Sequence, residues 1–96
     1  MASYQLTEDA EEDVEGLYEY SILHFGLQQA GDYVNGLHGC LGNLADRPRL
    51  GRDYSHVKEN TLRFEYQSHS VYYTITSYGI LVLRVLGASM DPGRHL

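Results

Sequence analysis

The sequence predicts an α+β domain: a first strand, a two-helix hairpin and then a three-stranded antiparallel sheet, with the helices packed on one face of the sheet. Apolar residues recur at helical spacing through the first half of the chain, whereas the second half holds three short segments of alternating or continuous apolar residues. Glycine, proline and serine separate these segments. At 96 residues the chain suits a single domain, 1–96, with a modest core.

The first helix is predicted to follow a short strand at residues 4–6 and to end at Phe25. Thr7 suits its N-cap because a threonine hydroxyl accepts hydrogen bonds from the free amides of the first turn. The acids after it lie at the positive end of the helix dipole, and Gly26 fits a left-handed C-terminal cap. The residues expected on the packed face are Ala10, Val14, Leu17, Tyr18, Ser21, Ile22 and Phe25.

A second helix is predicted over residues 27–46, and Pro48 ends it because proline disfavours helical geometry in the residue before it. Its apolar stripe consists of Ala30, Tyr33, Val34, Leu37, Cys40, Leu41 and Leu44. The one cysteine of the chain lies on this stripe, which indicates a small buried apolar side chain rather than a nucleophile.

Four glycines interrupt the second helix on the side opposite its stripe: Gly31, Gly36, Gly39 and Gly42. Each glycine costs roughly 1 kcal/mol relative to alanine inside a helix. One interpretation is a helix that tolerates this weakness. The other is a bare backbone that lets a second chain approach closely, and replacing all four glycines by alanine separates the two.

The sheet is predicted in the second half, after an irregular stretch at residues 49–60. Residues 62–66 alternate as a strand, and the two residues after it turn into a hairpin. Alternation over residues 69–75 predicts a half-buried strand, whereas the apolar run 80–86 predicts a strand covered on both faces. Between these two strands, Gly79 supplies the positive φ of a tight turn.

Charge is distributed unevenly along the chain. Residues 1–46 hold nine of the thirteen acids and no Lys or Arg, whereas residues 47–96 hold four acids and all seven bases. The two halves therefore present opposite potentials, which indicates charged partners. The basic surplus is too slight for a protein that grips a nucleic-acid backbone. Because no segment suits a signal peptide or a membrane span, we expect a cytoplasmic protein.

No motif in the sequence supports catalysis. The five histidines are scattered, and neither an HExxH motif nor a pair of cysteines indicates a metal site. The helical glycines lack the spacing of a phosphate-binding loop. We therefore predict no catalytic residue, no metal and no cofactor.

An ordered set of motifs over nearly the whole chain resembles the ParE toxins of the RelE/ParE superfamily. The motif that carries most weight is the closing one, from His69-Ser70-Val71-Tyr72-Tyr73 through Leu83-Arg84-Val85-Leu86 and Met90-Asp91 to Arg94-His95-Leu96. The earlier motifs are Tyr4-Gln5-Leu6-Thr7, Phe25-Gly26 with Gln29-Ala30 and Tyr33, Leu44-Ala45-Asp46-Arg47-Pro48 with Leu50-Gly51-Arg52, and Leu62-Arg63. The resemblance implies the RelE/ParE-like fold that the residue patterns also predict.

The resemblance implies the toxin component of a type II toxin–antitoxin system, a protein inhibitor rather than an enzyme. Such a toxin traps DNA gyrase on cleaved DNA. A ParD-type antitoxin neutralises it by laying its own C-terminal segment on the toxin, and operator DNA is bound only through the antitoxin.

The alternative within the superfamily is a RelE-type ribosome-dependent mRNA endoribonuclease. Such an enzyme needs a base for the ribose hydroxyl and cations for the phosphate. The matching positions here are His69, Arg84, Arg94 and His95, with no closing tyrosine. A pI near 5.1 makes the grip on RNA physically awkward.

Two binding surfaces are predicted. For the target we expect the end of the hairpin and the polar tail, represented by Arg84, Met90, Asp91, Arg94, His95 and Leu96. For the antitoxin we expect the acidic helical half, represented by Glu12, Glu15, Glu19, Leu23, Asp32, Gly36 and Gly39. Arg52 and Arg63 are further possible target contacts, although each has a nearby acid, Asp53 or Glu65, with which to pair.

Overall fold

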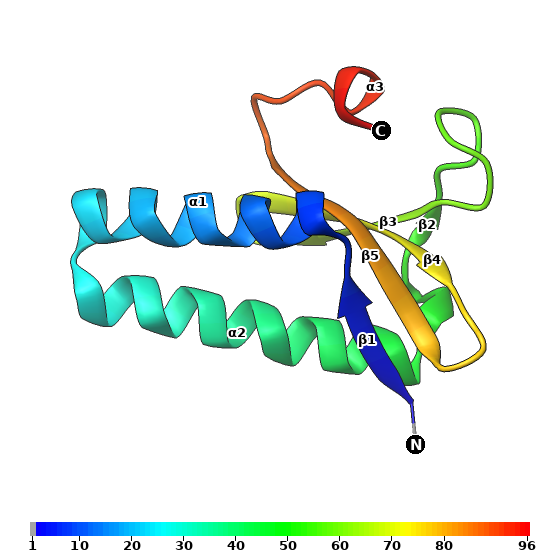
Figure 1. Ribbon diagram of the computed structural model, residues 1–96, viewed down its shortest axis with the longest axis horizontal. Coiled ribbons are helices and arrows are strands. Elements are labelled where there is room, and N and C mark those ends of the chain that lie inside the picture. The colour runs from blue at the N-terminus through cyan, green and yellow to red at the C-terminus, as the bar shows by residue number, and fades with distance from the viewer. Residues whose placement is uncertain (1) are drawn as a thin grey trace.

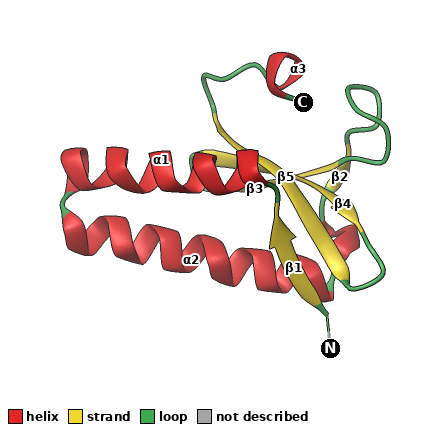
Figure 2. Cartoon of the chain, in the orientation of Figure 1, coloured by secondary structure: helices red, strands yellow, loops and turns green. Residues whose placement is uncertain are grey.

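The computed structural model describes residues 2–96 as two layers, with a helical hairpin packed on one face of a five-stranded sheet (Figure 1; Figure 2). The elements are β1 (Ser3–Leu6), α1 (Glu8–Phe25), α2 (Leu27–Asp46), a 3₁₀ turn η1 (Pro48–Leu50), β2 (Arg52–Asp53), β3 (Leu62–Tyr66), β4 (His69–Ile75), β5 (Gly79–Gly87) and α3 (Pro92–His95). The strand order is β1-β5-β4-β3-β2. The α+β class and the two-helix hairpin are thus confirmed.

The sheet has more strands than the three predicted, because an edge strand joins it on each side. β1 pairs in parallel with β5, and β2 pairs antiparallel with β3. The stretch 49–60 is therefore less irregular than predicted. Gly79 has the expected positive φ, at 146°, and a side chain there would also collide with the backbone of Ser3. Glycine is thus required by the turn and by the close approach of β1.

α1 covers the edge of β5 that β1 leaves open. The pairing of β1 stops at Leu6 opposite Val82, and groups of the N-cap residue Thr7 and of α1 then form hydrogen bonds with β5. The Thr7 amide donates to the Val82 carbonyl (3.0 Å), and the Thr7 hydroxyl donates to the Leu83 carbonyl (2.9 Å). Further along, the Val85 amide donates to Asp13 Oδ2 (2.9 Å). The first half of α1 therefore replaces a strand, which satisfies edge groups that would otherwise be exposed.

The N-cap of α1 agrees with the sequence prediction, whereas the C-cap agrees with it only in the sign of φ. Thr7 Oγ1 accepts a hydrogen bond from the Ala10 amide (3.1 Å), as expected of an N-cap. Gly26 has the predicted positive φ of 90°, but its ψ of 165° is extended rather than left-handed helical. The difference arises because Gly26 also begins α2, whose axis runs back along α1.

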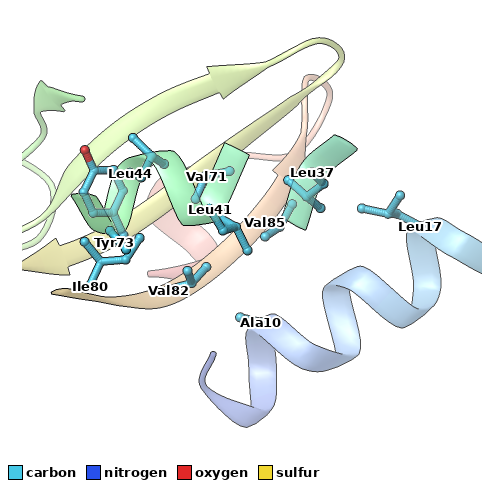
Figure 3. Close-up of a cluster of buried hydrophobic side chains, with 11 residues drawn as sticks. Ala10, Leu17, Leu37, Leu41, Leu44, Val71, Tyr73, Ile80, Val82 and Val85 are labelled. Atoms are coloured by element: carbon cyan, nitrogen blue, oxygen red, sulfur yellow. The ribbon is translucent and has the colours of Figure 1, made fainter. Parts of the chain in front are cut away.

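The core lies between the stripe of α2 and the inner face of β4 and β5 (Figure 3). Leu37, Leu41 and Leu44 are fully buried there, which confirms the predicted stripe. They pack with side chains of the other elements, namely Ala10, Leu17, Val71, Tyr73, Ile80, Val82 and Val85. Burial of these apolar side chains is the main favourable contribution to folding.

The far ends of α1 and α2 extend beyond the sheet (Figure 1). Phe25, predicted to lie on the packed face of α1, is 58% exposed for this reason. Tyr20, Leu23 and Leu27 are also exposed near the same end, at 57%, 83% and 66%. The prediction for Phe25 was wrong because helical spacing gives the direction of a side chain but not whether anything lies opposite it.

β4 was predicted to be half-buried, but the four consecutive residues Ser70 to Tyr73 are all buried. Val71 and Tyr73 belong to the core, whereas Tyr72 points to the other face, where the Tyr54 ring lies 5.3 Å from its own. The prediction failed because the loop between β2 and β3 folds over this second face. β5, predicted to be covered on both faces, has Leu81 and Leu83 only half-buried.

The polar tail is ordered on the same side as this loop, and it ends in α3 (Figure 1). Asp91 caps α3 by accepting from the Gly93 amide (3.0 Å). Two cations reach the tail from elsewhere: Arg84 Nη1 donates to the His95 carbonyl (3.2 Å), and Lys58 Nζ donates to Leu96 O (3.3 Å). The tail is therefore held by side chains of β5 and of the loop.

The four glycines of α2 fall into two groups, and this leads to a stability prediction. A Cβ at Gly36 would collide with the Tyr66 hydroxyl, whereas Gly31, Gly39 and Gly42 face open space. Gly36 is thus packed against its own chain, which contradicts the interpretation of four equally bare positions.

Replacing the three open glycines, Gly31, Gly39 and Gly42, by alanine is expected to raise the free energy of unfolding by about 2–3 kcal/mol, from roughly 1 kcal/mol at each site. Gly36→Ala is expected to raise the free energy of unfolding by less than this, or to lower it, because the added methyl group collides with Tyr66. Urea denaturation of each variant measures the free energy of unfolding.

Among residues 2–96, neither long helix has the apolar composition that a membrane span requires. The same residues contain no cluster of three or more His, Cys, Asp or Glu side chains placed to hold a metal ion.

Candidate functional site

A groove runs along one side of α1. It consists of two hollows that share Tyr20 and His69, which we name together the α1 groove. The first hollow, of about 490 Å³, lies between the first half of α1 and the end of β5, with Met90 on its far wall. The second, of about 380 Å³, lies between the far ends of the helices and the turn that joins β3 to β4. The groove therefore follows α1 from Glu12 to Phe25, which at 1.5 Å per residue is about 20 Å of helix.

The two ends of the α1 groove differ in chemistry. Glu12 and Asp13 line the first hollow, and the exposed Glu15 and Glu19 follow on the same helix. The second hollow is bordered by Phe25, whose ring is more than half exposed. Exposed aromatic rings at the end of a concave surface are typical of protein-binding sites. The groove thus has one acidic and one apolar end.

The floor of the groove, where the two hollows meet, is uncharged. The Tyr33 hydroxyl lies 2.7 Å from His69 Nδ1 and donates to the Tyr66 carbonyl (3.4 Å). Burial lowers the pKa of His69 and raises the pKa of Tyr33, so both side chains are neutral near pH 7. The charge of the groove is therefore set by its acids.

Arg84, predicted to contact the target, is bonded within its own chain. Its Nε donates to Asp13 Oδ2 (2.7 Å) and its Nη2 to Asp13 Oδ1 (2.8 Å), and the two side chains are only 17% and 11% exposed. The hydrogen bonds that Arg84 donates to Asp13 raise the pKa of Arg84 above its ordinary value, so the guanidinium stays charged. Arg84 can therefore contribute to target binding only indirectly, by positioning the residues to which it is hydrogen-bonded.

The structure separates the residues predicted for the antitoxin surface. Of the antitoxin set, Glu12 lines the α1 groove and Leu23 is exposed near its apolar end, whereas Asp32 and Gly39 lie exposed on α2. Gly36 is packed against Tyr66. The antitoxin set is thus spread over several faces of the helical hairpin.

Apart from Arg84, which lies in β5, the predicted target residues lie together in the tail. The side chains of Arg94 and Asp91 are 84% and 66% exposed and 3.9 Å apart, and His95, the last residue of α3, and Leu96 follow Arg94. Met90 lies at the root of the tail and lines the α1 groove opposite Glu12. The two predicted surfaces therefore meet at Met90.

Sequence reasoning assigned none of the groove residues Tyr20, Phe25, Tyr33 and His69 to the antitoxin surface. One signal was available, because Tyr20 is a large aromatic residue outside the predicted apolar face of its helix. The contribution of His69 depends on a contact between α2 and β4 that periodicity does not reveal.

The remaining cations on the second face are partly engaged. Arg63 pairs with Glu65 (3.3 Å), as one of the two readings of the sequence allowed, and its guanidinium also donates to Ser70 Oγ. Asp53 instead accepts hydrogen bonds from Ser55, which lower the pKa of Asp53. Arg63 is therefore engaged within its own chain, whereas Asp53 bonds to Ser55 rather than to Arg52.

Comparison with known proteins gives consistent results. Residues 4–92 match the family described as ParE toxin of type II toxin-antitoxin system, parDE. Toxin ParE1 of Caulobacter vibrioides is 29% identical over 96 residues, which covers 100% of this chain and 99% of that protein. Toxin ParE1 of Mycobacterium tuberculosis is 29% identical over 94 residues, covering 97% of this chain and 96% of that protein.

A solved structure has the same fold. A chain of the chromosomal ParDE toxin–antitoxin system from P. aeruginosa superposes with a TM-score of 0.77 at 17% sequence identity, covering 91% of this chain and 96% of that chain. The family match spans all the elements from β1 to the start of α3, including the α1 groove. The chain therefore belongs to the ParE toxin family of type II toxin–antitoxin systems.

Proposed function

We propose that this toxin acts by binding DNA gyrase and trapping it on cleaved DNA, and that a ParD-type antitoxin neutralises it. The family match over residues 4–92 carries the proposal. In this proposal the tail meets the target and the α1 groove meets the antitoxin. Operator DNA is reached only through the antitoxin, and the cytoplasm is the compartment in which this function operates.

Binding rather than catalysis is supported by the state of the cationic side chains. Cleavage of RNA without a metal needs cations free to stabilise the phosphate. Here Arg84 is neutralised by Asp13 and Arg63 is shared between Glu65 and Ser70, while the chain has a net charge of −6. These features favour a protein inhibitor over the ribonuclease alternative.

The α1 groove favours an antitoxin segment whose charged and apolar residues lie at opposite ends. Its acidic end at Glu12 suits Lys or Arg, and its apolar end at Phe25 suits leucine or aromatic anchors. The antitoxin segment that lies here is therefore cationic where it passes Met90 and apolar where it reaches the ends of the helices.

Salt is expected to slow the association of the antitoxin with this chain. Exposed acids steer a cationic partner, and their field is screened within roughly 8–10 Å at physiological salt. The triple variant Glu12→Gln, Glu15→Gln, Glu19→Gln should associate more slowly and depend less on salt, whereas Glu59→Gln, an exposed acid outside the helical half, should behave as the unchanged chain. Stopped-flow measurement across a salt series tests this. Rates that are indifferent to salt would contradict the acidic docking surface.

The decisive experiment for the target is DNA supercoiling by purified gyrase with and without this protein, scored for trapped double-strand breaks. Breaks that accumulate in proportion to the protein, and that the antitoxin prevents, are the expected result. A ribosome-programmed mRNA cleavage assay is run beside it. Cleavage of mRNA with many turnovers per protein molecule, and no effect on gyrase, would replace the proposal with the ribonuclease alternative.

A further inference from the structure

Arg84 joins three parts of the molecule that lie far apart in the sequence. It is a residue of β5, it holds Asp13 on α1 through two nitrogens, and its third nitrogen, Nη1, donates to the His95 carbonyl in the tail, residues 88–96 (3.2 Å). Both oxygens of Asp13 are engaged, because Oδ2 also accepts from the Val85 amide. The position of the tail is therefore linked to α1 through one side chain.

The geometry of this link is specific to arginine. A guanidinium bonded to a carboxylate through two parallel hydrogen bonds is fixed in its plane, so its remaining nitrogen points in a set direction. In this structure that direction leads to the His95 carbonyl. A lysine ammonium is a single charged atom on a flexible stem and cannot hold both groups in this way.

The second contact with the tail is weaker. Lys58 Nζ donates to Leu96 O at 3.3 Å, but this contact is exposed to solvent. Exposed contacts of a flexible lysine contribute little to stability, whereas the Arg84 contact is largely shielded from water. Arg84 is thus the principal attachment of the tail apart from its chain connection to β5.

We propose that Asp13 and Arg84 are positioning residues for the target-binding tail, and that Asp13 couples the tail to the α1 groove. Asp13 lines the acidic end of the groove as well as holding Arg84. A cationic side chain of a segment in the groove competes with Arg84 for this carboxylate, and the His95 contact loosens as a result. An antitoxin therefore displaces the tail without having to cover it; this rests on the functions proposed above for groove and tail.

Trypsin provides a direct readout, because Arg94 is an exposed cleavage site within the tail. Cleavage after Arg94 tracks the population of the released tail when release is fast relative to cleavage. Asp13→Asn and Arg84→Lys are expected to speed this cleavage by about tenfold, the change expected when one hydrogen bond to a charged group is lost. Glu11→Gln, an exposed acid on the same helix that belongs to neither predicted binding surface, is the matched control and should leave the rate unchanged.

A substitution inside the groove tests the coupling without an antitoxin. Gly16 lines the first hollow, lies one helical turn from Asp13, and has open space where a side chain would begin. Gly16→Arg places a guanidinium beside Asp13 and is expected to speed cleavage after Arg94 by roughly twofold, since oppositely charged pairs three residues apart on a helix attract each other. Gly16→Gln, a polar but uncharged substitution, should leave the rate of cleavage after Arg94 unchanged.

The outcomes separate the inference from the proposed function. Unchanged cleavage after Arg94 in both Asp13→Asn and Arg84→Lys, with melting temperatures that show folded protein, overturns the positioning role. Gly16→Arg indistinguishable from Gly16→Gln overturns the coupling. Faster cleavage with undiminished growth arrest supports the link between Asp13, Arg84 and the tail but removes the tail as the target-binding segment, which is a failure of the proposed function alone.

Discussion

A chain that lacks residues 91–96 is expected to lose growth arrest completely while keeping its affinity for the antitoxin. The tail carries the exposed charged and polar groups of α3, and its removal takes away Arg94 and His95. Met90 is retained in this variant because it lines the α1 groove. Growth of a bacterial host on induction, together with calorimetric titration of the antitoxin, measures the two effects separately.

Point substitutions control for a folding defect in the truncated chain. Arg94→Ala with His95→Ala leaves in place the hydrogen bond from the Arg84 side chain to the main-chain carbonyl of residue 95, and it removes only side chains of the tail. This double variant should have the same melting temperature as the unchanged chain, and it should arrest growth less strongly than the unchanged chain does. Full arrest by both the truncated chain and the double variant would rule out the tail as the target-binding segment.

Tyr20→Ala is expected to weaken antitoxin binding by more than tenfold and to leave the fold almost unchanged. Tyr20 borders both hollows of the α1 groove, and an aromatic residue at the centre of an interface typically contributes about 2 kcal/mol or more. It is 57% exposed in the free chain, where its ring stacks on His24 with centroids 3.8 Å apart, so little core packing is lost.

The matched control for Tyr20→Ala is Leu50→Ala. Leu50 is a large apolar residue with a similar exposure of 50%, but it lies beside Arg47 and Arg52 and away from the groove. Calorimetry should show a loss of affinity for Tyr20→Ala alone. Equal affinities for the two variants would place the antitoxin on some other surface.

The helices could be predicted from the sequence because their signals are local. Thr7, Gly26 and Pro48 each act within a few residues, and the apolar stripe of α2 repeats along one helix. The parallel pairing of β1 with β5 could not be predicted in this way, since Ser3 and Gly79 are brought together only by the completed fold. The same limit explains why the number of strands was underestimated.

The candidate site was predicted only in outline. The excess of acids in the helical half indicated a docking surface, and Glu12 does line the α1 groove. The sequence could not show that Arg84 is occupied by Asp13, which lies 71 residues earlier, or that His69 forms the floor of the groove. Both facts depend on which elements become neighbours, and residue patterns alone do not determine this.

The pairing of β1 with β5 also bears on how this protein is made. Residues 3–6 hydrogen-bond with residues 79–82, so the first strand has no partner until most of the chain has been synthesised. Contacts between such distant segments form late and slow the folding of small proteins. The sheet of a nascent chain therefore stays incomplete until residues 79–82 have left the ribosome.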